Sequence, residues 1–183
     1  MGEGQNRKKV RIKHAVGGIV YFAAIACGAF LMIRYVGQRI VVDGTSMVPT
    51  LNDGDNLFVD KISYRFCDPE RFDIIVFPHE SNGKSVYFIK RIVGIPGDTV
   101  EVKNGRVYIN GCELEEPIET EEMLSAGIAG ETITLGKDEY FVLGDNRNHS
   151  NDSRSPDVGI ITGDKIVGKA WLRIWPLSEI TKL

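Results

Sequence analysis

The chain has 183 residues and a formal net charge of −3. Two unlike parts make up this total: residues 1–14 hold five Lys or Arg and one acid, whereas residues 37–183 hold 16 basic and 24 acidic residues and therefore a net charge of −8. Nucleic-acid binding requires a basic surface, so the acidic part excludes nucleic acid as the main partner. Its 147 residues suffice for one domain with a core, which excludes a large multidomain enzyme.

The first predicted element is a transmembrane helix within residues 15–36. Residues 15–33 form a run of 19 residues without a charge, which spans ~28 Å as a helix and so matches the hydrocarbon core of a bilayer. Basic residues cluster before the run, so the positive-inside rule places residues 1–14 in the cytoplasm and residues 37–183 outside it. The alternative is a cleaved secretory signal, whose apolar region is shorter and ends in a small-x-small site. The sequence favours a retained single-pass anchor in contact with membrane lipid.

The elements predicted after this run are strands. Short segments rich in Val, Ile, Phe and Tyr alternate with turn residues, at residues 40–42, 57–62, 74–77, 86–93, 99–102, 106–109, 132–135, 140–143 and 165–175. Asn104-Gly105 and Asn110-Gly111 predict tight turns, because Asn and Gly tolerate positive φ. Residues 120–128 are the one plausible short helix. The fold class predicted for residues 37–183 is all-β, with antiparallel sheets packed as two layers or as a partial barrel.

Neither the cysteines nor the histidines predict a metal or a cofactor. The sequence has no CxxC, HExxH, Walker or GxGxxG motif, and its three His residues lie far apart. Cys67 and Cys112 could form a disulfide outside the cytoplasm, but their spacing leaves this open. Six Glu residues within residues 113–122 predict a solvated loop.

Three segments contain candidate catalytic residues. Ser46 lies in Gly-Thr-Ser-Met-Val-Pro-Thr at residues 44–50, which by itself would be an ordinary hydroxyl-capped turn. Lys90 lies in an apolar strand, and if its face is buried, desolvation lowers the pKa from ~10.4 to ~8, where lysine can act as a general base. A solvated lysine on an edge strand is the alternative. Residues 144–154 interleave acids with arginines, which is typical either of a surface loop or of an ion-pair network beside a site.

Taken in order, these segments resemble the bacterial type I signal peptidases of family S26, the membrane-anchored Ser/Lys endopeptidases that remove signal peptides from exported proteins. The resemblance covers nearly the whole chain and is carried by the apolar run and by five ordered motifs, at residues 44–50, 54–64, 73–77, 90–98 and 144–154. It implies a catalytic domain of the signal peptidase type in a bacterial cell membrane. It also implies exported preproteins as substrates and cleavage after small-x-small sites. The activity that it implies involves no metal, cofactor or nucleic acid, and the oligomeric state stays open.

The same resemblance assigns roles to individual residues. It implies that Ser46 is the nucleophile and Lys90 the general base. Backbone N–H groups in the region of Gly44 and Ser46 would stabilise the oxyanion, and Met47 would line the substrate site. Ser150 would donate a hydrogen bond that orients the Lys90 amine.

Two supporting ion pairs are also implied by the resemblance. Asp152 with Arg154, and Asp145 with Arg91, would hold residues 144–154 against the strand of Lys90. As isolated surface pairs they would contribute only ~0–1 kcal/mol. Some members of the family place a hydroxyl two residues before the nucleophile, whereas this chain has Gly44 there.

Three other interpretations share parts of the pattern. A self-cleaving Ser/Lys repressor has a related β core, but it carries a DNA-binding region in place of the anchor. The eukaryotic and archaeal signal peptidases use His as the base where this chain has Lys90. A non-catalytic anchored β domain would not require both Ser46 and Lys90.

Overall fold

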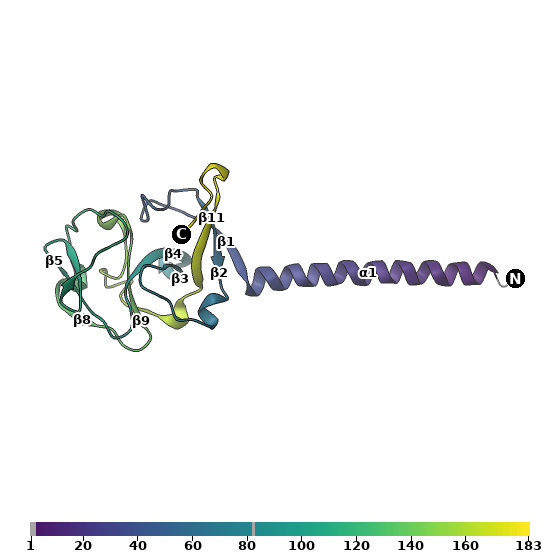
Figure 1. Cartoon of the computed structure of the whole chain (residues 1–183), viewed down its shortest axis with the longest axis horizontal. Helices are drawn as coiled ribbons and strands as arrows, with labels where there is room; N and C mark the ends of the chain where they lie inside the picture. The colour runs from purple at the N-terminus through teal and green to yellow at the C-terminus, as the bar shows by residue number, and fades with distance from the viewer. Residues whose placement is uncertain (1–2, 82) are drawn as a thin grey trace. The chain divides into compact units, whose positions relative to one another are not determined.

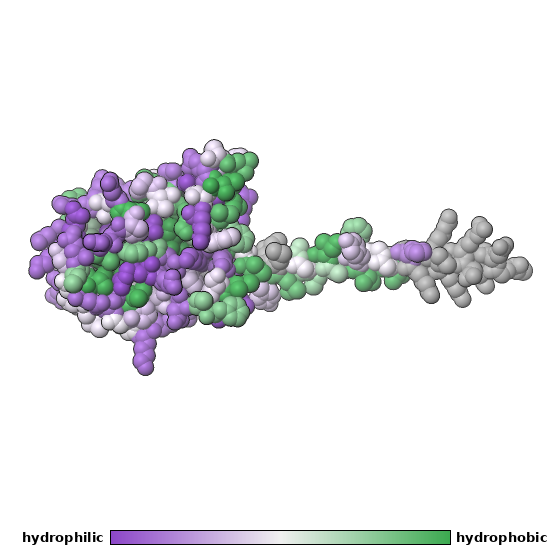
Figure 2. Space-filling model, viewed as in Figure 1, coloured by the Kyte–Doolittle hydropathy of each residue, from purple (hydrophilic) through white to green (hydrophobic). Residues whose placement is uncertain are grey.

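The computed structural model describes residues 3–81 and 83–183, without the side chains of residues 3–13, 15 and 32–34. The chain divides into two compact units, and the boundary between them in the sequence falls between Gly37 and Gln38. The first unit contains the helix α1 (Glu3–Tyr35). Its described side chains are mainly apolar and exposed (Figure 2). Among the described residues, no helix is both long and apolar enough to cross a membrane. The predicted run 15–33 includes three side chains outside the described set, so the membrane anchor stays a prediction.

The second unit contains two antiparallel sheets (Figure 1). The larger sheet has the strand order β1-β2-β11-β3-β4-β9-β10, with β12 beside β11. Its strands are β1 (Gly37–Val41), β2 (Asn56–Asp60), β3 (Ile74–Ser81), β4 (Lys84–Gly94), β9 (Glu139–Leu143), β10 (Ile161–Thr162), β11 (Gly168–Trp175) and β12 (Thr181–Lys182). β3 and β4 form a long hairpin in which Ile75 lies opposite Lys90. This hairpin carries the predicted base in the middle of the sheet.

The smaller sheet has the order β7-β6-β5-β8. Its strands are β5 (Thr99–Lys103), β6 (Arg106–Ile109), β7 (Cys112–Glu113) and β8 (Ile133–Thr134). Both predicted turns are confirmed, since Asn104, Gly105, Asn110 and Gly111 all have positive φ, between 51° and 82°. The buried valines of β5 and β6 pack in one cluster with Phe141 and Leu143 of β9. The small sheet is therefore packed against the strand that leads into the polar segment at residues 144–154.

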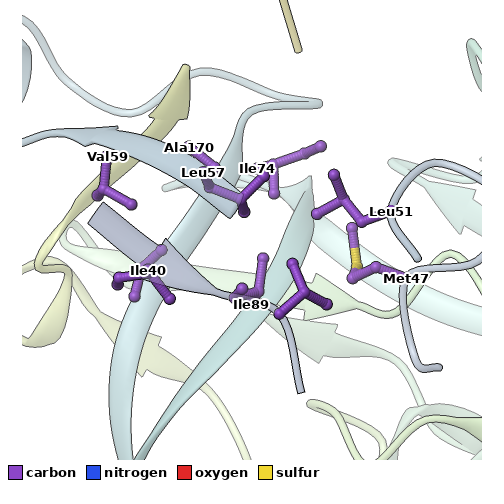
Figure 3. Packing of buried hydrophobic residues seen from close by; sticks show 10 residues of the cluster. Ile40, Met47, Leu51, Leu57, Val59, Ile74, Ile89 and Ala170 are labelled. Atoms are coloured by element: carbon purple, nitrogen blue, oxygen red, sulfur yellow. The ribbon is translucent and has the colours of Figure 1, made fainter. Parts of the chain in front are cut away.

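A second hydrophobic cluster lies beneath the segment that follows β1 (Figure 3). Ile40 of β1, Val59 of β2 and Ile89 of β4 belong to it, and so do Met47 and Leu51, which are 1% and 0% exposed. Because Met47 and Leu51 lie on either side of a short turn, their burial fastens this turn to the large sheet. The candidate Ser46 precedes Met47 and is fixed with it.

Several sequence-based predictions can be compared with these elements. The prediction of antiparallel sheets is confirmed, and neither sheet closes into a barrel. The helix predicted at 120–128 is wrong: the structure has a 3-10 turn, η2 (Gly127–Gly130). Backbone N–H groups in this region donate to other loops instead, Met123 to Gly105 O at 3.0 Å and Ile128 to Arg154 O at 2.9 Å.

The cysteines are free and exposed, so Cys67 and Cys112 form no disulfide in this structure.

Candidate active site

Residues 44–50, the serine loop, form a series of turns between β1 and β2. Gly44 has a φ of 101°, a conformation that favours glycine, and its N–H donates to Asp53 Oδ1 at 2.8 Å. At the other end, Leu51 N–H donates to Met47 O at 2.8 Å, and both side chains are buried. Ser46 is therefore held from both sides while remaining half-buried.

Lys90 reaches Ser46 from the middle of β4. Its side chain is 3% exposed, and its Nζ donates to Ser46 Oγ at 2.8 Å and to Ile89 O at 3.0 Å. Nζ also lies 4.9 Å from the centroid of the Phe88 ring. The structure thus joins the predicted serine and the predicted lysine by a direct hydrogen bond. Of the two sequence-based alternatives for Lys90, it has the buried lysine and not the solvated edge lysine.

Burial lowers the pKa of Lys90 to about 8, because desolvation disfavours the ammonium form. The carboxylates of Asp152 and Asp145 act in the opposite direction and raise the pKa. With a pKa of about 8, about a tenth of the molecules carry a neutral amine at pH 7, against fewer than about one in 1000 for an ordinary lysine. A neutral amine within hydrogen-bonding distance of a hydroxyl can act as its general base.

Asp145 connects the strand of Lys90 to the serine loop. It accepts two hydrogen bonds from Arg91, from Nε at 2.8 Å and from Nη2 at 2.7 Å, in a bidentate ion pair. It also accepts a hydrogen bond from the Thr50 hydroxyl. The next residue, Asn146, donates its backbone N–H to Ser46 O at 3.1 Å. Thr50 and Asn146 were not predicted as site residues from the sequence. The available signal was that they lie within the motifs at residues 44–50 and 144–154.

Asp152 connects the two ends of the segment 144–154, called the polar loop. Arg154 donates from Nε to Oδ1 at 2.8 Å and from Nη2 to Oδ2 at 2.9 Å. Gly144 N–H donates to Oδ2 at 3.1 Å. Asp152 and Arg154 are both buried, and removing one partner of such a pair costs ~3–5 kcal/mol. Both ion pairs implied by the resemblance therefore form, and they are buried pairs, not surface pairs. Of the two, Asp145–Arg91 connects the polar loop to β4, whereas Asp152–Arg154 joins two residues of the loop itself.

The predicted hydrogen bond from Ser150 to Lys90 does not form in this structure. The Ser150 Oγ is buried and has no hydrogen-bond partner among the described residues. It packs against Gly144 instead: a Cβ added at Gly144 would lie 2.2 Å from Ser150 Oγ and 2.5 Å from Ser46 O. Gly144 is thus a position where a side chain would displace the serine loop, and sequence reasoning missed it.

Arg147 links the polar loop to the acidic segment at residues 113–122. Its Nε donates to Gly144 O at 3.1 Å, and its Nη2 forms an ion pair with Glu116. The prediction of a solvated loop is wrong for Glu116, whose side chain is 9% exposed because it turns inward to Arg147. The other five acids are exposed: Glu113, Glu115, Glu119, Glu121 and Glu122. The sequence contains no signal that separates Glu116 from these neighbours.

A groove of about 580 Å³ opens at Ser46 and Lys90. One wall is formed by β1 and the residues after it, and the other by residues 86–90 of β4. Gly44 and Met47 are among the residues that line it. Within the described part of the chain, β9 pairs with β4 only from Arg91 onward, so the backbone edge of β4 before this residue has no neighbouring strand on that side. An extended peptide can bind to such an edge by main-chain hydrogen bonds.

Two groups were predicted to form the oxyanion region. The Gly44 N–H is occupied by Asp53, so Gly44 does not provide a free donor. The Ser46 N–H has no acceptor among the described residues and is the available donor. The described residues contain no group of three or more His, Cys, Asp or Glu that could hold a metal ion.

The sequence is similar to known proteins over most of its length. Residues 14–175 match the family described as signal peptidase, peptidase S26. The chain is 41% identical over 152 residues to the probable signal peptidase I-2 of Synechocystis sp., covering 80% of this chain and 66% of that protein. A crystal structure of a signal peptidase I from Enterococcus faecalis is 36% identical and has a TM-score of 0.45, covering 56% of this chain and 97% of that one. Signal peptidase I of Bacillus licheniformis is 35% identical over 188 residues, covering 98% of this chain and 97% of that protein. The family match and this near full-length identity show that the chain belongs to the signal peptidase family, peptidase S26, whose enzymes remove signal peptides.

Proposed function

We propose that Ser46 and Lys90 form the catalytic dyad of this peptidase, with Ser46 as the nucleophile and Lys90 as the general base. The observation that carries the proposal is the 2.8 Å hydrogen bond between Lys90 Nζ and Ser46 Oγ. The lowered pKa of Lys90, about 8, supports it because a base must be neutral to accept a proton. The hydrogen bond that Asp145 accepts from Thr50 and the one that Asn146 donates to Ser46 O support it further, since they fix the serine loop relative to β4.

The reaction follows from these positions. The neutral Lys90 amine takes the proton of the Ser46 hydroxyl while Oγ attacks the scissile carbonyl carbon, and the Ser46 N–H donates to the oxyanion that develops. The Lys90 ammonium returns the proton to the leaving amine, so that the C–N bond breaks and an ester on Ser46 remains. Lys90 then takes a proton from water, whose oxygen attacks the ester. Transfer of that proton to Ser46 Oγ completes hydrolysis and restores the dyad.

The proposed substrate is the signal peptide of an exported preprotein, bound in the groove as an extended chain. The unpaired edge of β4 at residues 84–90 supports this, because it offers main-chain hydrogen bonds. In an extended chain, alternate side chains point to the same face. The first and third residues before the cut would therefore face the apolar wall that contains Ile40, Val42 and Met47. A preference of the groove for small side chains at both positions is the small-x-small specificity.

The proposed location is the bacterial cell membrane, with a single membrane-spanning helix. The uncharged run at 15–33 supports a span, and the five basic residues within 1–14 support a cytoplasmic N-terminus. Residues 37–183 then lie on the side of the membrane where exported chains emerge. Removal of the anchor would separate the enzyme from membrane-inserted substrates. Fractionation of cells that express the full chain or a chain without the anchor can measure this difference in location.

Cleavage of a preprotein by the detergent-solubilised full-length chain tests the proposal, with Ser46→Ala and Lys90→Ala measured alongside. N-terminal sequencing of the product should show one cut after a small-x-small site. Both variants should lose more than about 1000-fold in rate, as removal of a nucleophile or its base does, while keeping the circular dichroism of the wild type. Cleavage that persists in Lys90→Ala would reject the Ser/Lys mechanism. A wild-type chain inert on several preproteins would favour the non-catalytic domain.

A further inference from the structure

We propose that Glu116 is a positioning residue for Ser46, acting through Arg147 and Gly144. The inference rests on the proposed role of Ser46 as the nucleophile. It assigns a task in catalysis to the acidic segment of the small sheet, which contributes no residue to the groove. Three contacts connect Glu116 to the serine loop.

The first contact is the buried ion pair between Glu116 and Arg147. The Arg147 side chain is 1% exposed, and a guanidinium removed from water requires a counter-charge and hydrogen-bond acceptors. Among the described residues, Glu116 is the carboxylate paired with it. Loss of this charge would drive the guanidinium toward solvent or toward another acceptor.

The second contact is the hydrogen bond from Arg147 Nε to Gly144 O, at 3.1 Å. On the other side, the Gly144 N–H donates to Asp152 Oδ2, also at 3.1 Å. The two peptide groups of Gly144 are therefore held by different side chains of the polar loop. Asp152 is fixed by Arg154, whereas the orientation of Arg147 depends on Glu116.

The third contact is the packing of Gly144 against the serine loop. A Cβ at Gly144 would lie 2.5 Å from Ser46 O, so the backbone of Gly144 abuts this carbonyl group. Asn146, two residues later, donates its N–H to the same Ser46 O. A displacement of Gly144 therefore moves Ser46 relative to Lys90 Nζ. A misplacement of about 1 Å can reduce a rate by about 100-fold, so a smaller shift is measurable.

Glu116→Gln tests the inference, because glutamine keeps the shape of the side chain and removes its charge. The matched control is Glu115→Gln, which makes the same change at an exposed neighbour. In cleavage of a preprotein-derived peptide by the detergent-solubilised full chain, Glu116→Gln should lower kcat about tenfold and leave KM within about twofold, because Glu116 does not line the groove. Glu116→Asp keeps the charge and should recover part of kcat. Glu115→Gln should behave as the wild type.

A double variant separates this route from a general loss of structure. Glu116→Gln combined with Arg147→Met should be no slower than Arg147→Met alone, since Glu116 acts only through Arg147 in this scheme. Losses that multiply, or a Glu116→Gln kcat equal to that of Glu115→Gln, would overturn the inference. Unfolding midpoints establish that each variant is folded at the assay temperature. If Glu116→Gln is not folded, Arg147→Met decides: because Glu116 acts through Arg147, a kcat equal to the wild type in this variant overturns the inference.

The two proposals fail in different ways. Activity that survives Ser46→Ala would refute the dyad itself. Activity that depends on Ser46 but is unaffected at Glu116 would refute the positioning role alone.

Discussion

The pH dependence of cleavage follows from the burial of Lys90. Below its pKa the amine is protonated and cannot accept the Ser46 proton, so kcat/KM should rise with pH and reach half of its plateau at about pH 8. Each pH unit below that value should lower the rate about tenfold, and at about pH 6 the rate should be about one hundredth of the plateau. A peptide-cleavage assay between about pH 6 and pH 10 measures this profile.

The same pKa predicts how stability depends on pH. The folded state holds Lys90 with a pKa of about 8 and the unfolded state with the ordinary value of 10.5, so the folded state binds fewer protons between these values. The difference corresponds to about 3 kcal/mol against folding. This cost is complete below pH 8 and disappears as the pH rises past 10.5. The side chain is 3% exposed, so screening by solvent is small.

A Lys90→Met variant makes the cost measurable, because methionine has a similar length and no charge. Urea unfolding should find Lys90→Met more stable than the wild type by about 3 kcal/mol at about pH 7, with the difference vanishing above about pH 10.5. Lys137→Met is the control at an exposed position and should show no such pH dependence. A half-maximal pH above about 10, together with a Lys90→Met variant no more stable than the wild type, would refute the reasoning from burial.

Three further substitutions test the surroundings of the dyad. Gly144→Ala introduces a Cβ whose nearest atom would lie 2.2 Å away, and should lower kcat about 100-fold in the peptide assay, whereas Gly130→Ala, with its nearest atom at 3.5 Å, should keep full activity. Asp145→Asn leaves the Arg91 guanidinium buried without its counter-charge and should lower the free energy of unfolding by ~3–5 kcal/mol in urea titrations. Met47→Ala should cost ~2–5 kcal/mol in the same measurement because it leaves a cavity in the core. A change below about 1 kcal/mol in either case would contradict the packing described above.

Local features of this fold were predictable because they depend on neighbours in the chain. Asn104-Gly105 forms the predicted turn, since the positive φ it requires is a property of these two residues. The apolar run around Lys90 predicted a strand, and β4 covers this run, with Lys90 and Ile92 both buried. The 120–128 segment shows the limit of such signals: its backbone donors bind other loops, so local helix propensity was overruled.

By itself, then, the sequence determined the strands, the turns and, through the family resemblance, the candidate dyad. The tertiary structure decided which side chains meet: Lys90 bonds Ser46 across 44 positions, and Arg147 pairs with Glu116 across 31. It also placed the Ser150 hydroxyl beside Gly144, without the predicted hydrogen bond to Lys90. The physical reason is that a strand or turn is stabilised by contacts within a few residues. The partner of a buried charge depends instead on which distant segments the core brings together.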